Sequence, residues 1–470
     1  MIKRKHVRAL LVGALLVALG GCLSMAVTGA AAEVSFSQKD REEFAARRAR
    51  LFEKIGDGVA VIVADEAHVH VVRFHQSPDF YYLTGIEEPG SVLVLDGAKK
   101  QSYVFARKRS PGKVKVEGPG LLELPAPHEA YGLTQVLPIE NLISVLNNVT
   151  RDARKLYLQL TPPDSLQMAR DEMEAAEDSL LNHPLYQYKP PRKQVVNRLH
   201  ELYPQLTMED VNPLLDSLRW IKTPYEIERL RRSGQIGAEG IKEAIRGTKP
   251  GMFEYELEAA AQFVHTKLGA HDAFILIVAS GPNTATVHYD ANTRQMQAGE
   301  LVLMDTGADY AYYNSDITRT WPVSGTFTPE QEKMYRCILE ARQAIIAAMK
   351  PGVTIKQLQD VSEEVYRKHG YRQEFLKLGR YVGHYVGLSV HDVNSFNLLQ
   401  PLQAGVVFNV EPVLEMPERK IHLRLEDTVL VTPTGAETLT AGVPVEINEI
   451  YALIREKGLN SNNESRGNKK

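Results

Sequence analysis

The chain has 470 residues, too many for one ordinary domain, and its 44% hydrophobic and 24% charged residues are typical of a water-soluble globular protein with an ample core. The 55 Lys and Arg residues nearly balance the 58 Asp and Glu residues, so the formal net charge is only -3. This balance lacks the basic excess of a nucleic-acid-binding surface, which argues against nucleic acid as a partner. We expect two domains.

The first residues have the pattern of an export signal. Lys and Arg residues among the first eight positions precede the apolar run 9–19, and alanines occupy positions 30–32. The apolar run is shorter than the roughly 20 residues that span a bilayer, which favours a cleaved signal over a membrane anchor. We predict that residues 1–32 are an export signal and that the mature chain is periplasmic, secreted or lipid-anchored outside the cytoplasm.

The cysteines add one alternative to this prediction. The motif Leu19-Gly20-Gly21-Cys22 resembles a lipoprotein box, in which the cysteine is lipidated after cleavage. Cleavage after Ala32 competes with it, so a membrane tether through Cys22 stays open. Cys337 is the second of only two cysteines, so the mature chain has no internal disulfide framework, and we assign Cys337 no role.

Residues 33–205 combine helical and β-rich patterns, which predicts a mixed α/β domain. An amphipathic helix is expected first and a short apolar strand bounded by glycine follows it. The expected helix spans 37–56, and the expected β-rich runs are 58–64, 80–83, 91–95, 102–106 and 155–159. The sequence then becomes polar and proline-bearing between 162 and 205, which is typical of a domain junction, so we place the boundary near residue 205.

The second domain, residues 206–455, contains two helices with strong start signals. Thr223 is the expected cap of the first helix, with a proline after it and Glu226 placed to close a capping box, and this helix is expected to end at Gly247. The second helix repeats the pattern from Thr328 and stops at Pro351. The final residues 456–470 are rich in Asn, Ser, Lys and Gly, which predicts a disordered tail.

Four carboxylates lie in strand-like segments of this second domain. Asp305 ends an apolar segment, and Asp316 follows eleven residues later, after a glycine and tyrosines that suit a turn. Antiparallel pairing of the two segments would bring these carboxylates together. Glu411 and Glu426 occupy similar positions in VVFNVE and HLRLEDTVLVT. Burying four carboxylates is costly unless cations compensate, so the pattern predicts divalent metal ions held by oxygen ligands.

Three histidines near these segments are further candidates. His384 adds an imidazole to the four carboxylates, and this set suits manganese, with cobalt, zinc or iron as alternatives. His391 follows seven residues later, and His288 lies in VHYDAN. Each lone histidine would by default be structural, so the prediction depends on the whole set.

The ordered set Asp305, Asp316, His384, Glu411 and Glu426 resembles the metal-binding set of the creatinase and methionine aminopeptidase superfamily. The motifs that carry the resemblance are MDTGADY, SDITRTWPVSG, GHYVGLSVHD, NVEP and RLEDTVLVT. Within this superfamily the chain is similar to the aminopeptidase P family, whose first domain and linking helix are matched by SPDFYYLTGIEEPGSVLVL, KTPYEIERLRRS and KPGMFEYELE. The resemblance covers roughly residues 34–455.

This resemblance implies an α+β fold class with two domains, a creatinase-like mixed α/β domain followed by a pita-bread catalytic domain. It implies that Asp316 and Glu426 bridge two divalent metal ions. Asp305 would complete one metal site, and His384 with Glu411 would complete the other. A metal-bridging water or hydroxide would then be the nucleophile.

The resemblance also implies roles for residues around the metals. Glu411 is the implied general base, and His288 and His391 match the histidines that hydrogen-bond the substrate and the tetrahedral intermediate. Arg424 is expected to orient Asp305. The chain departs from the family pattern in three places. Arg380 stands where relatives commonly have a histidine, the run after Glu411-Pro412 reads Val413-Leu414-Glu415 where relatives usually read Gly-Leu-Tyr, and Glu415 replaces a tyrosine near the metal ligands.

The implied activity is that of a dinuclear metalloaminopeptidase that hydrolyses the amino-terminal Xaa-Pro bond of peptides with proline at the second position, in a homo-oligomer. This bond is a tertiary amide without an N–H, so peptidases that align the backbone through hydrogen bonds handle it poorly. A prolidase, which cleaves Xaa-Pro dipeptides, and a broader aminopeptidase stay open as alternatives. A non-catalytic peptide-binding protein or a creatinase-like amidinohydrolase would lack the metal ligands, and all five are present.

Overall fold

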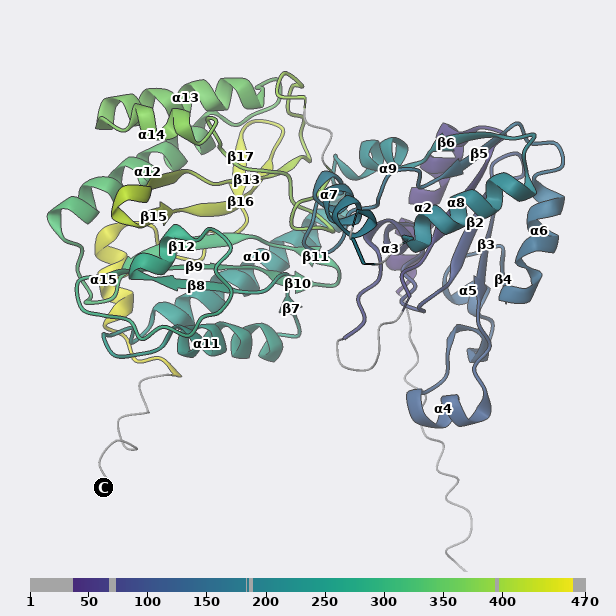
Figure 1. Ribbon diagram of the computed structural model, residues 1–470, viewed down its shortest axis with the longest axis horizontal. Coiled ribbons are helices and arrows are strands. Elements are labelled where there is room, and N and C mark those ends of the chain that lie inside the picture. The colour runs from purple at the N-terminus through teal and green to yellow at the C-terminus, as the bar shows by residue number, and fades with distance from the viewer. Residues whose placement is uncertain (1–36, 67–72, 183, 186–188, 394–396, 460–470) are drawn as a thin grey trace, which may run out of the picture.

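The computed structural model describes residues 37–66, 73–182, 184–185, 189–393 and 397–459, and these residues form two domains that lie side by side (Figure 1). The predicted export signal 1–32, with Cys22, and residues 460–470 of the predicted tail lie outside the described residues. Among the helices that are described, none is both long and apolar enough to cross a membrane. The last described residue, Leu459, packs on the second domain, where its backbone N–H donates to Glu243 at 2.6 Å.

The first domain is built on a six-stranded mixed sheet with the strand order β4-β3-β2-β1-β5-β6. Its strands are β1 (Val59–Val63), β2 (Val92–Asp96), β3 (Gln101–Ala106), β4 (Gln135–Pro138), β5 (Lys155–Leu158) and β6 (Thr207–Asp210). The central strands β1, β2 and β3 pair antiparallel, and the remaining pairs are parallel. Both faces are buried, because the neighbouring residues Ala60 and Val61 of β1 belong to hydrophobic clusters on opposite sides of the sheet.

Helices cover both faces of this sheet (Figure 1). One face packs against α2 (Gln38–Ile55), α3 (Pro78–Thr84) and α9 (Asn212–Arg219). The other face packs against α6 (Leu142–Val149) and α8 (Pro191–Leu202). The domain also contains the short helices α4 (Pro111–Glu117) and α5 (Pro127–Ala130). The first helix begins at its cap Ser37, as the sequence predicts.

Two features of the first domain differ from the sequence prediction. The expected β-rich run 80–83 is wrong, since these residues lie in α3: Ser77 caps that helix by accepting from the N–H of Phe80, and Pro78 occupies its first turn. The boundary predicted near residue 205 precedes β6, which pairs with β5 in the first sheet, and α9, which packs on the same sheet. We infer that the junction lies between α9 and the next helix.

The second domain centres on a sheet with the strand order β13-β16-β12-β9-β8, to which β17 adds by pairing with β16. The strands are β8 (Ile277–Ser280), β9 (Leu301–Thr306), β12 (Ile317–Pro322), β13 (Val407–Val410), β16 (Glu426–Val431) and β17 (Ala436–Thr438). Two smaller sheets accompany it, a three-stranded one and a two-stranded ribbon. They comprise β7 (His271–Asp272), β10 (Ala308–Tyr310) and β11 (Tyr313–Asn314), and β14 (Val413–Met416) and β15 (Ile421–Arg424).

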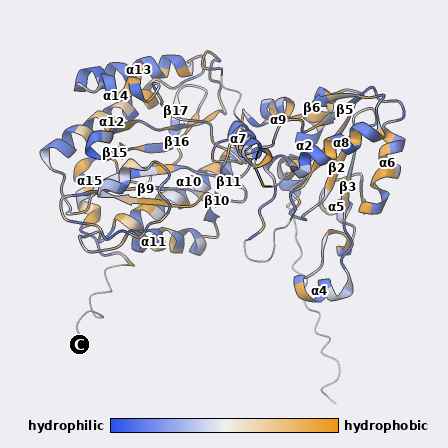
Figure 2. Ribbon diagram, viewed as in Figure 1, coloured by the Kyte–Doolittle hydropathy of each residue, from blue (hydrophilic) through white to orange (hydrophobic). Residues whose placement is uncertain are grey.

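Amphipathic helices pack on these sheets and share one large hydrophobic core with them. Figure 2 shows that the helices carry hydrophilic and hydrophobic residues on different sides. The helices are α10 (Pro224–Ile245), α11 (Glu254–Lys267), α12 (Pro329–Ala348), α13 (Ile355–His369), α14 (Arg372–Lys377) and α15 (Ile447–Ile454). Thr223 and Thr328 form the predicted capping boxes of α10 and α12.

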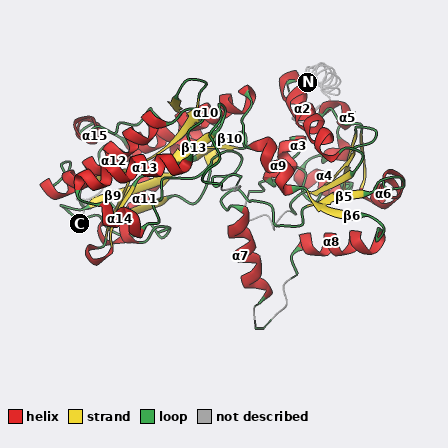
Figure 3. Cartoon of the chain, turned by 90° about the horizontal axis from the view of Figure 1, so that it is seen from above, coloured by secondary structure: helices red, strands yellow, loops and turns green. Residues whose placement is uncertain are grey.

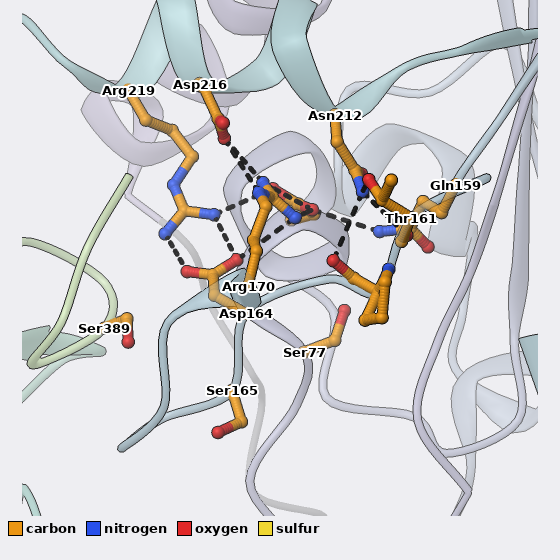
Figure 4. Close-up of polar contacts among 12 residues, drawn as sticks. Ser77, Gln159, Thr161, Asp164, Ser165, Arg170, Asn212, Asp216, Arg219 and Ser389 are labelled. Atoms are coloured by element: carbon orange, nitrogen blue, oxygen red, sulfur yellow. Dashed lines mark hydrogen bonds and ion pairs between the residues drawn. The ribbon is translucent and has the colours of Figure 1, made fainter. Parts of the chain in front are cut away.

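A buried group of charged residues joins the two domains. Figure 4 labels four of its members, Asp164, Arg170, Asp216 and Arg219. We call it the interdomain cluster and define it as Asp79, Asp164, Arg170, Asp216, Arg219, Lys222 and Asp392. Arg219 of α9 lies 2.8 Å from Asp79 of α3 and 2.6 Å from Asp164 in the loop after β5. It also binds Asp392 of the second domain, which accepts from Lys222 Nζ at 2.8 Å.

The remaining members of the interdomain cluster lie on α7 and α9. Helix α7 (Arg170–Leu181) lies between the two domains in both Figure 1 and Figure 3. Its first residue, Arg170, lies 2.7 Å from Asp216 and 3.3 Å from Asp79. The cluster therefore ties both domains and the connecting segments to one buried centre.

Candidate metal centre

Adjacent strands bring Asp305 and Asp316 together. β9 and β12 pair antiparallel with Thr318 directly opposite Asp305, and Asp316 precedes the first residue of β12. Both carboxylates are buried. The antiparallel pairing predicted from the sequence is therefore confirmed, and β10 and β11 occupy the segment that was expected to turn.

The other predicted ligands converge on the same place from three further segments. Glu411 directly follows β13 and Glu426 begins β16, and β16 pairs with both β13 and β12. The Nε2 atom of His384 lies 3.2 Å from Asp316 Oδ2, 3.8 Å from Glu426 Oε1 and 4.0 Å from Glu411 Oε2. We call these four residues, with Asp305 and Arg424, the carboxylate cluster.

One guanidinium faces the four carboxylates of this cluster. Arg424, the last residue of β15, donates to Asp305 Oδ2 at 2.5 Å and to Glu411 Oε1 at 3.1 Å. Burial raises the pKa of Asp316 and of Glu426 well above the ordinary range, and the neighbouring carboxylates raise both further. Burial also opposes ionisation of Glu411, but the charges of Arg424 and His384 outweigh it and lower the pKa of Glu411.

These residues fit divalent metal ions. The Oδ1 atoms of Asp305 and Asp316 are buried, yet neither has a hydrogen-bond partner among the described residues. Asp316, His384 and Glu426 each present a ligand atom, and these three atoms lie within 4.8 Å of one another. Carboxylate oxygens with a single imidazole are the donors of hard or borderline divalent cations, which would also compensate the excess of negative charge.

Neighbouring side chains hold the predicted ligands in orientation. Thr318 and Asn409 each donate to one oxygen of Glu426, and the Oγ1 of Thr428 accepts from the backbone N–H of Asp316 at 2.9 Å. Such outer hydrogen bonds fix the orientation of metal ligands. Thr318 had one signal in the sequence, since it is two residues from Asp316 on the same strand face.

His288 and His391 line two cavities that adjoin the carboxylate cluster, of about 280 and 260 Å³. The rings of His391 and His384 are 4.4 Å apart, centroid to centroid. The Nδ1 atom of His391 lies 3.0 Å from Glu172 Oε2 on α7. Glu172, which the sequence did not single out, therefore links the site to the helix between the domains.

Arg380 and Glu415, two residues at which the chain departs from the family pattern, lie in different places. Arg380 forms an ion pair with α13, where its Nε lies 2.8 Å from Glu363 Oε2. Glu415 lines the second cavity instead. A tyrosine still binds the site from another position, because the hydroxyl of Tyr381 donates to Glu411 Oε2 at 2.8 Å. The sequence carries no periodic signal for Tyr381, which lies in an irregular loop.

The sequence matches two family profiles, and they correspond to the two domains. Residues 228–433 match metallopeptidase family M24, and residues 44–157 match the aminopeptidase P N-terminal domain. The second domain, with its carboxylate cluster, is thus a metallopeptidase domain of the pita-bread type. The predicted α+β two-domain fold class is confirmed.

Individual relatives narrow this class. The chain is 32% identical to the Xaa-Pro aminopeptidase of Escherichia coli (strain K12) over 89% of its own length and 98% of the relative. It is 30% identical to the mitochondrial intermediate cleaving peptidase 55 of Arabidopsis thaliana, over 88% and 83% of the two chains. The protein belongs to the aminopeptidase P family of metallopeptidases and is a metalloaminopeptidase.

Solved structures agree with this assignment. Zinc-substituted E. coli aminopeptidase P in complex with product superposes with a TM-score of 0.75 at 30% identity, over 88% of this chain and 98% of that chain. A putative aminopeptidase P from Bacillus anthracis superposes with a TM-score of 0.78 at 29% identity, over 90% of this chain and all of that one.

Proposed function

We propose that this protein is a dinuclear metal-dependent aminopeptidase that hydrolyses the amino-terminal Xaa-Pro bond of peptides. The observation that carries the proposal is the carboxylate cluster, where four buried carboxylates and one histidine meet a single arginine. The names of the relatives support the choice of substrate, since several are Xaa-Pro aminopeptidases. The sequence similarity extends over nearly the full length of those relatives, which supports a shared activity.

The residues of the cluster divide into shared and separate ligands. Asp316 and Glu426 would be shared by two ions, Asp305 would complete one site, and His384 with Glu411 would complete the other. Manganese is the proposed ion, with cobalt, zinc or iron as alternatives. When bound, such ions lower the pKa of a water molecule and polarise the scissile carbonyl.

Glu411 is the proposed general base. Its two oxygens are held by Tyr381 and Arg424, and its pKa is lowered as described above, so the carboxylate is ionised near neutral pH. It would accept the proton of the attacking water and deliver it to the leaving proline nitrogen. Arg424 keeps both Glu411 and Asp305 in place through its two donor nitrogens.

His288 and His391 are the proposed contacts to the substrate and the tetrahedral intermediate. Both line the two cavities that flank the cluster. Glu172 engages the Nδ1 atom of His391, which leaves its Nε2 atom for the substrate. A hydrogen bond aimed at the developing oxyanion is worth roughly 2 to 4 kcal/mol in comparable sites.

The activity is tested by removing all metal and restoring manganese, cobalt, zinc or iron one at a time. Ala-Pro-Ala, Ala-Ala-Ala and Ala-Pro serve as substrates, with elemental analysis of each preparation. We expect about two ions per chain and cleavage of Ala-Pro-Ala but not Ala-Ala-Ala. The proposal fails if no ion binds stoichiometrically and neither manganese nor cobalt restores activity. Cleavage confined to Ala-Pro would replace it with a prolidase.

We also propose that the protein is exported and acts as a homo-oligomer. The basic and apolar pattern of residues 1–32 supports export, and Cys22 offers a lipid tether. Mass spectrometry of the native protein tests this, since the mature chain should begin at Cys22 or near Glu33. An intact segment 1–32 would contradict export, and a diacylglyceryl mass on Cys22 would establish the tethered form. Analytical ultracentrifugation tests the oligomer.

A further inference from the structure

The β14–β15 ribbon presents one face to the second cavity beside the carboxylate cluster. In its antiparallel register Val413 lies opposite Arg424, and Glu415 lies opposite His422. Because side chains alternate along a strand, these four residues share a face, and all four line the cavity. The intervening residues Leu414 and Leu423 are fully buried in the hydrophobic core.

His422 is a buried imidazole without a partner. His422 is only 3% exposed, yet neither of its ring nitrogens has a hydrogen-bond partner among the described residues. A buried polar group is normally satisfied, so its nitrogens are available to a ligand in the cavity. Burial and the charge of Arg424 lower the pKa of His422 to about 3, so the ring is neutral and has one donor and one acceptor nitrogen.

Glu415, directly across the ribbon, adds a negative charge at the same place. It is half-buried and lines the cavity, and no Lys or Arg of the described chain lies within ion-pair distance of its carboxylate. Arg424 on the same face is already engaged by Asp305 and Glu411. A second free carboxylate at this end of the cavity would therefore meet repulsion without a compensating cation.

The position of Glu411 indicates which part of the substrate lies near Glu415 and His422. Under the proposed function Glu411 delivers a proton to the proline nitrogen, and Glu411 lines the same cavity as the ribbon. Proline and the residue after it then occupy this cavity. Glu415 and His422 are two residues along the ribbon from Val413 and Arg424, roughly 7 Å, which is within reach of the group that follows the proline ring.

We propose that Glu415 and His422 select substrates in which an amide follows the proline and reject Xaa-Pro dipeptides. This inference rests on the proposed function and names its substrate class more closely. An amide after proline offers a carbonyl acceptor and an N–H donor, which match the donor and acceptor of a neutral imidazole. A dipeptide offers only a charged carboxylate, which Glu415 repels.

The test compares Ala-Pro, Ala-Pro-NH2 and Ala-Pro-Ala, because the first two differ in charge but hardly in size. The wild type, Glu415→Gln and His422→Phe are assayed with equal metal content, and Glu418→Gln, an exposed neighbour in the turn of the ribbon, is the control. Wild type should prefer Ala-Pro-NH2 over Ala-Pro by about tenfold or more in kcat/KM. Glu415→Gln should raise kcat/KM for Ala-Pro about tenfold and leave Ala-Pro-NH2 within about twofold. His422→Phe should lower kcat/KM for Ala-Pro-NH2 and Ala-Pro-Ala but not for Ala-Pro.

Calorimetric binding of proline and prolinamide supplies a readout that needs no turnover. Wild type should bind prolinamide more tightly than proline, and Glu415→Gln should abolish that preference. The inference is overturned if Glu415→Gln changes the values for carboxylate and amide ligands by the same factor, or if His422→Phe changes none of them. Failure of the proposed function would give a different result. No proline peptide would then be cut with any metal, while the binding constants for proline and prolinamide could still be measured.

Discussion

Two buried clusters in the described part of the chain contain four carboxylates each, and they differ in how this negative charge is compensated. In the interdomain cluster, the four aspartates face Arg170, Arg219 and Lys222. In the carboxylate cluster, four carboxylates face Arg424 and the imidazole of His384. The first cluster is nearly balanced by residues of the chain itself, whereas the second leaves most of its negative charge uncompensated.

The pKa values follow this difference. Burial alone would raise the pKa of Asp392, but the charges of Arg219 and Lys222 lower it to about 2. In the carboxylate cluster, burial and like charges together raise the pKa of Asp316 well above the ordinary range. The balance in the first cluster is incomplete, since burial raises the pKa of Asp216 to about 6 despite Arg170. A cluster with its own cations supports the fold, and a cluster without them is prepared for external cations.

The largest expected effect is the loss of turnover when Glu411 is replaced. Glu411→Gln removes the proposed proton acceptor, so kcat on Ala-Pro-Ala should fall roughly 10²- to 10⁴-fold while peptide affinity falls much less. Steady-state kinetics and peptide binding, with metal content measured on the same sample, test this. Glu418→Gln is the matched control and should keep wild-type kcat. A glutamine variant with wild-type kcat would disprove the assignment of the base.

The second expected effect concerns the fold and is independent of metal. Arg219→Met removes the cation that Asp79, Asp164 and Asp392 share, which should cost about 3 to 5 kcal/mol of unfolding free energy. Urea denaturation with and without chelator measures it. Arg198→Met, which breaks the exposed contact to Glu201, is the control and should have little effect. Equal costs for the two variants would contradict the structural role of the interdomain cluster.

The third effect concerns the stability of the metal-free protein: removing a charged residue should destabilise the fold in the interdomain cluster but not in the carboxylate cluster. Metal at 100 times its Kd should stabilise the wild type by about 2.7 kcal/mol, because it binds only the folded chain. Asp316→Asn should lose most of this gain, yet its metal-free form should be as stable as the metal-free wild type or more so, since a buried repulsive carboxylate is removed. Thermal unfolding across a metal titration tests this. Strong destabilisation of the metal-free Asp316→Asn variant would show that the carboxylate is structural.

The fourth effect depends on pH. The pKa of Asp392 is lower in the folded chain, about 2, than its usual value near 3.8, so its ionised form stabilises the fold above about pH 4 by roughly 2 kcal/mol. This contribution should disappear as the pH falls from about 4 to about 2. Unfolding free energies of wild type and Asp392→Asn should differ at neutral pH and converge in that window. A constant difference down to pH 2 would contradict the shift.

The last effect concerns kcat and should come from His391, the link between the clusters. His391→Ala should leave metal content near normal and lower kcat by a factor equivalent to roughly 2 to 4 kcal/mol, because it removes a hydrogen bond to the intermediate. Glu172→Gln should lower kcat less, since it weakens only the contact that orients the ring. Kinetics with elemental analysis separate the two. Metal loss in His391→Ala would assign the residue to the metal site instead.

The sequence by itself determined the set of predicted ligands and much of the local structure. Capping signals located the starts of α10 and α12, because a cap is a local arrangement of a few consecutive residues, and the amphipathic pattern located α2. The turn signals between Asp305 and Asp316 predicted that their two segments pair, and the order of the five predicted ligands indicated the family. These features depend on spacing along the chain, which the sequence displays directly.

Only the tertiary structure decided what surrounds those ligands. Tyr381, Glu172 and His422 reach the site from a loop, from the first domain and from a separate ribbon, so no local pattern links them to it. The run 80–83 shows the converse, since a cap at Ser77 and the packing of α3 on the first sheet outweigh the β propensity of the aromatic residues. Contacts between distant segments depend on how the domains pack, and the interdomain cluster that joins them is formed by residues far apart in the sequence, from Asp79 to Asp392.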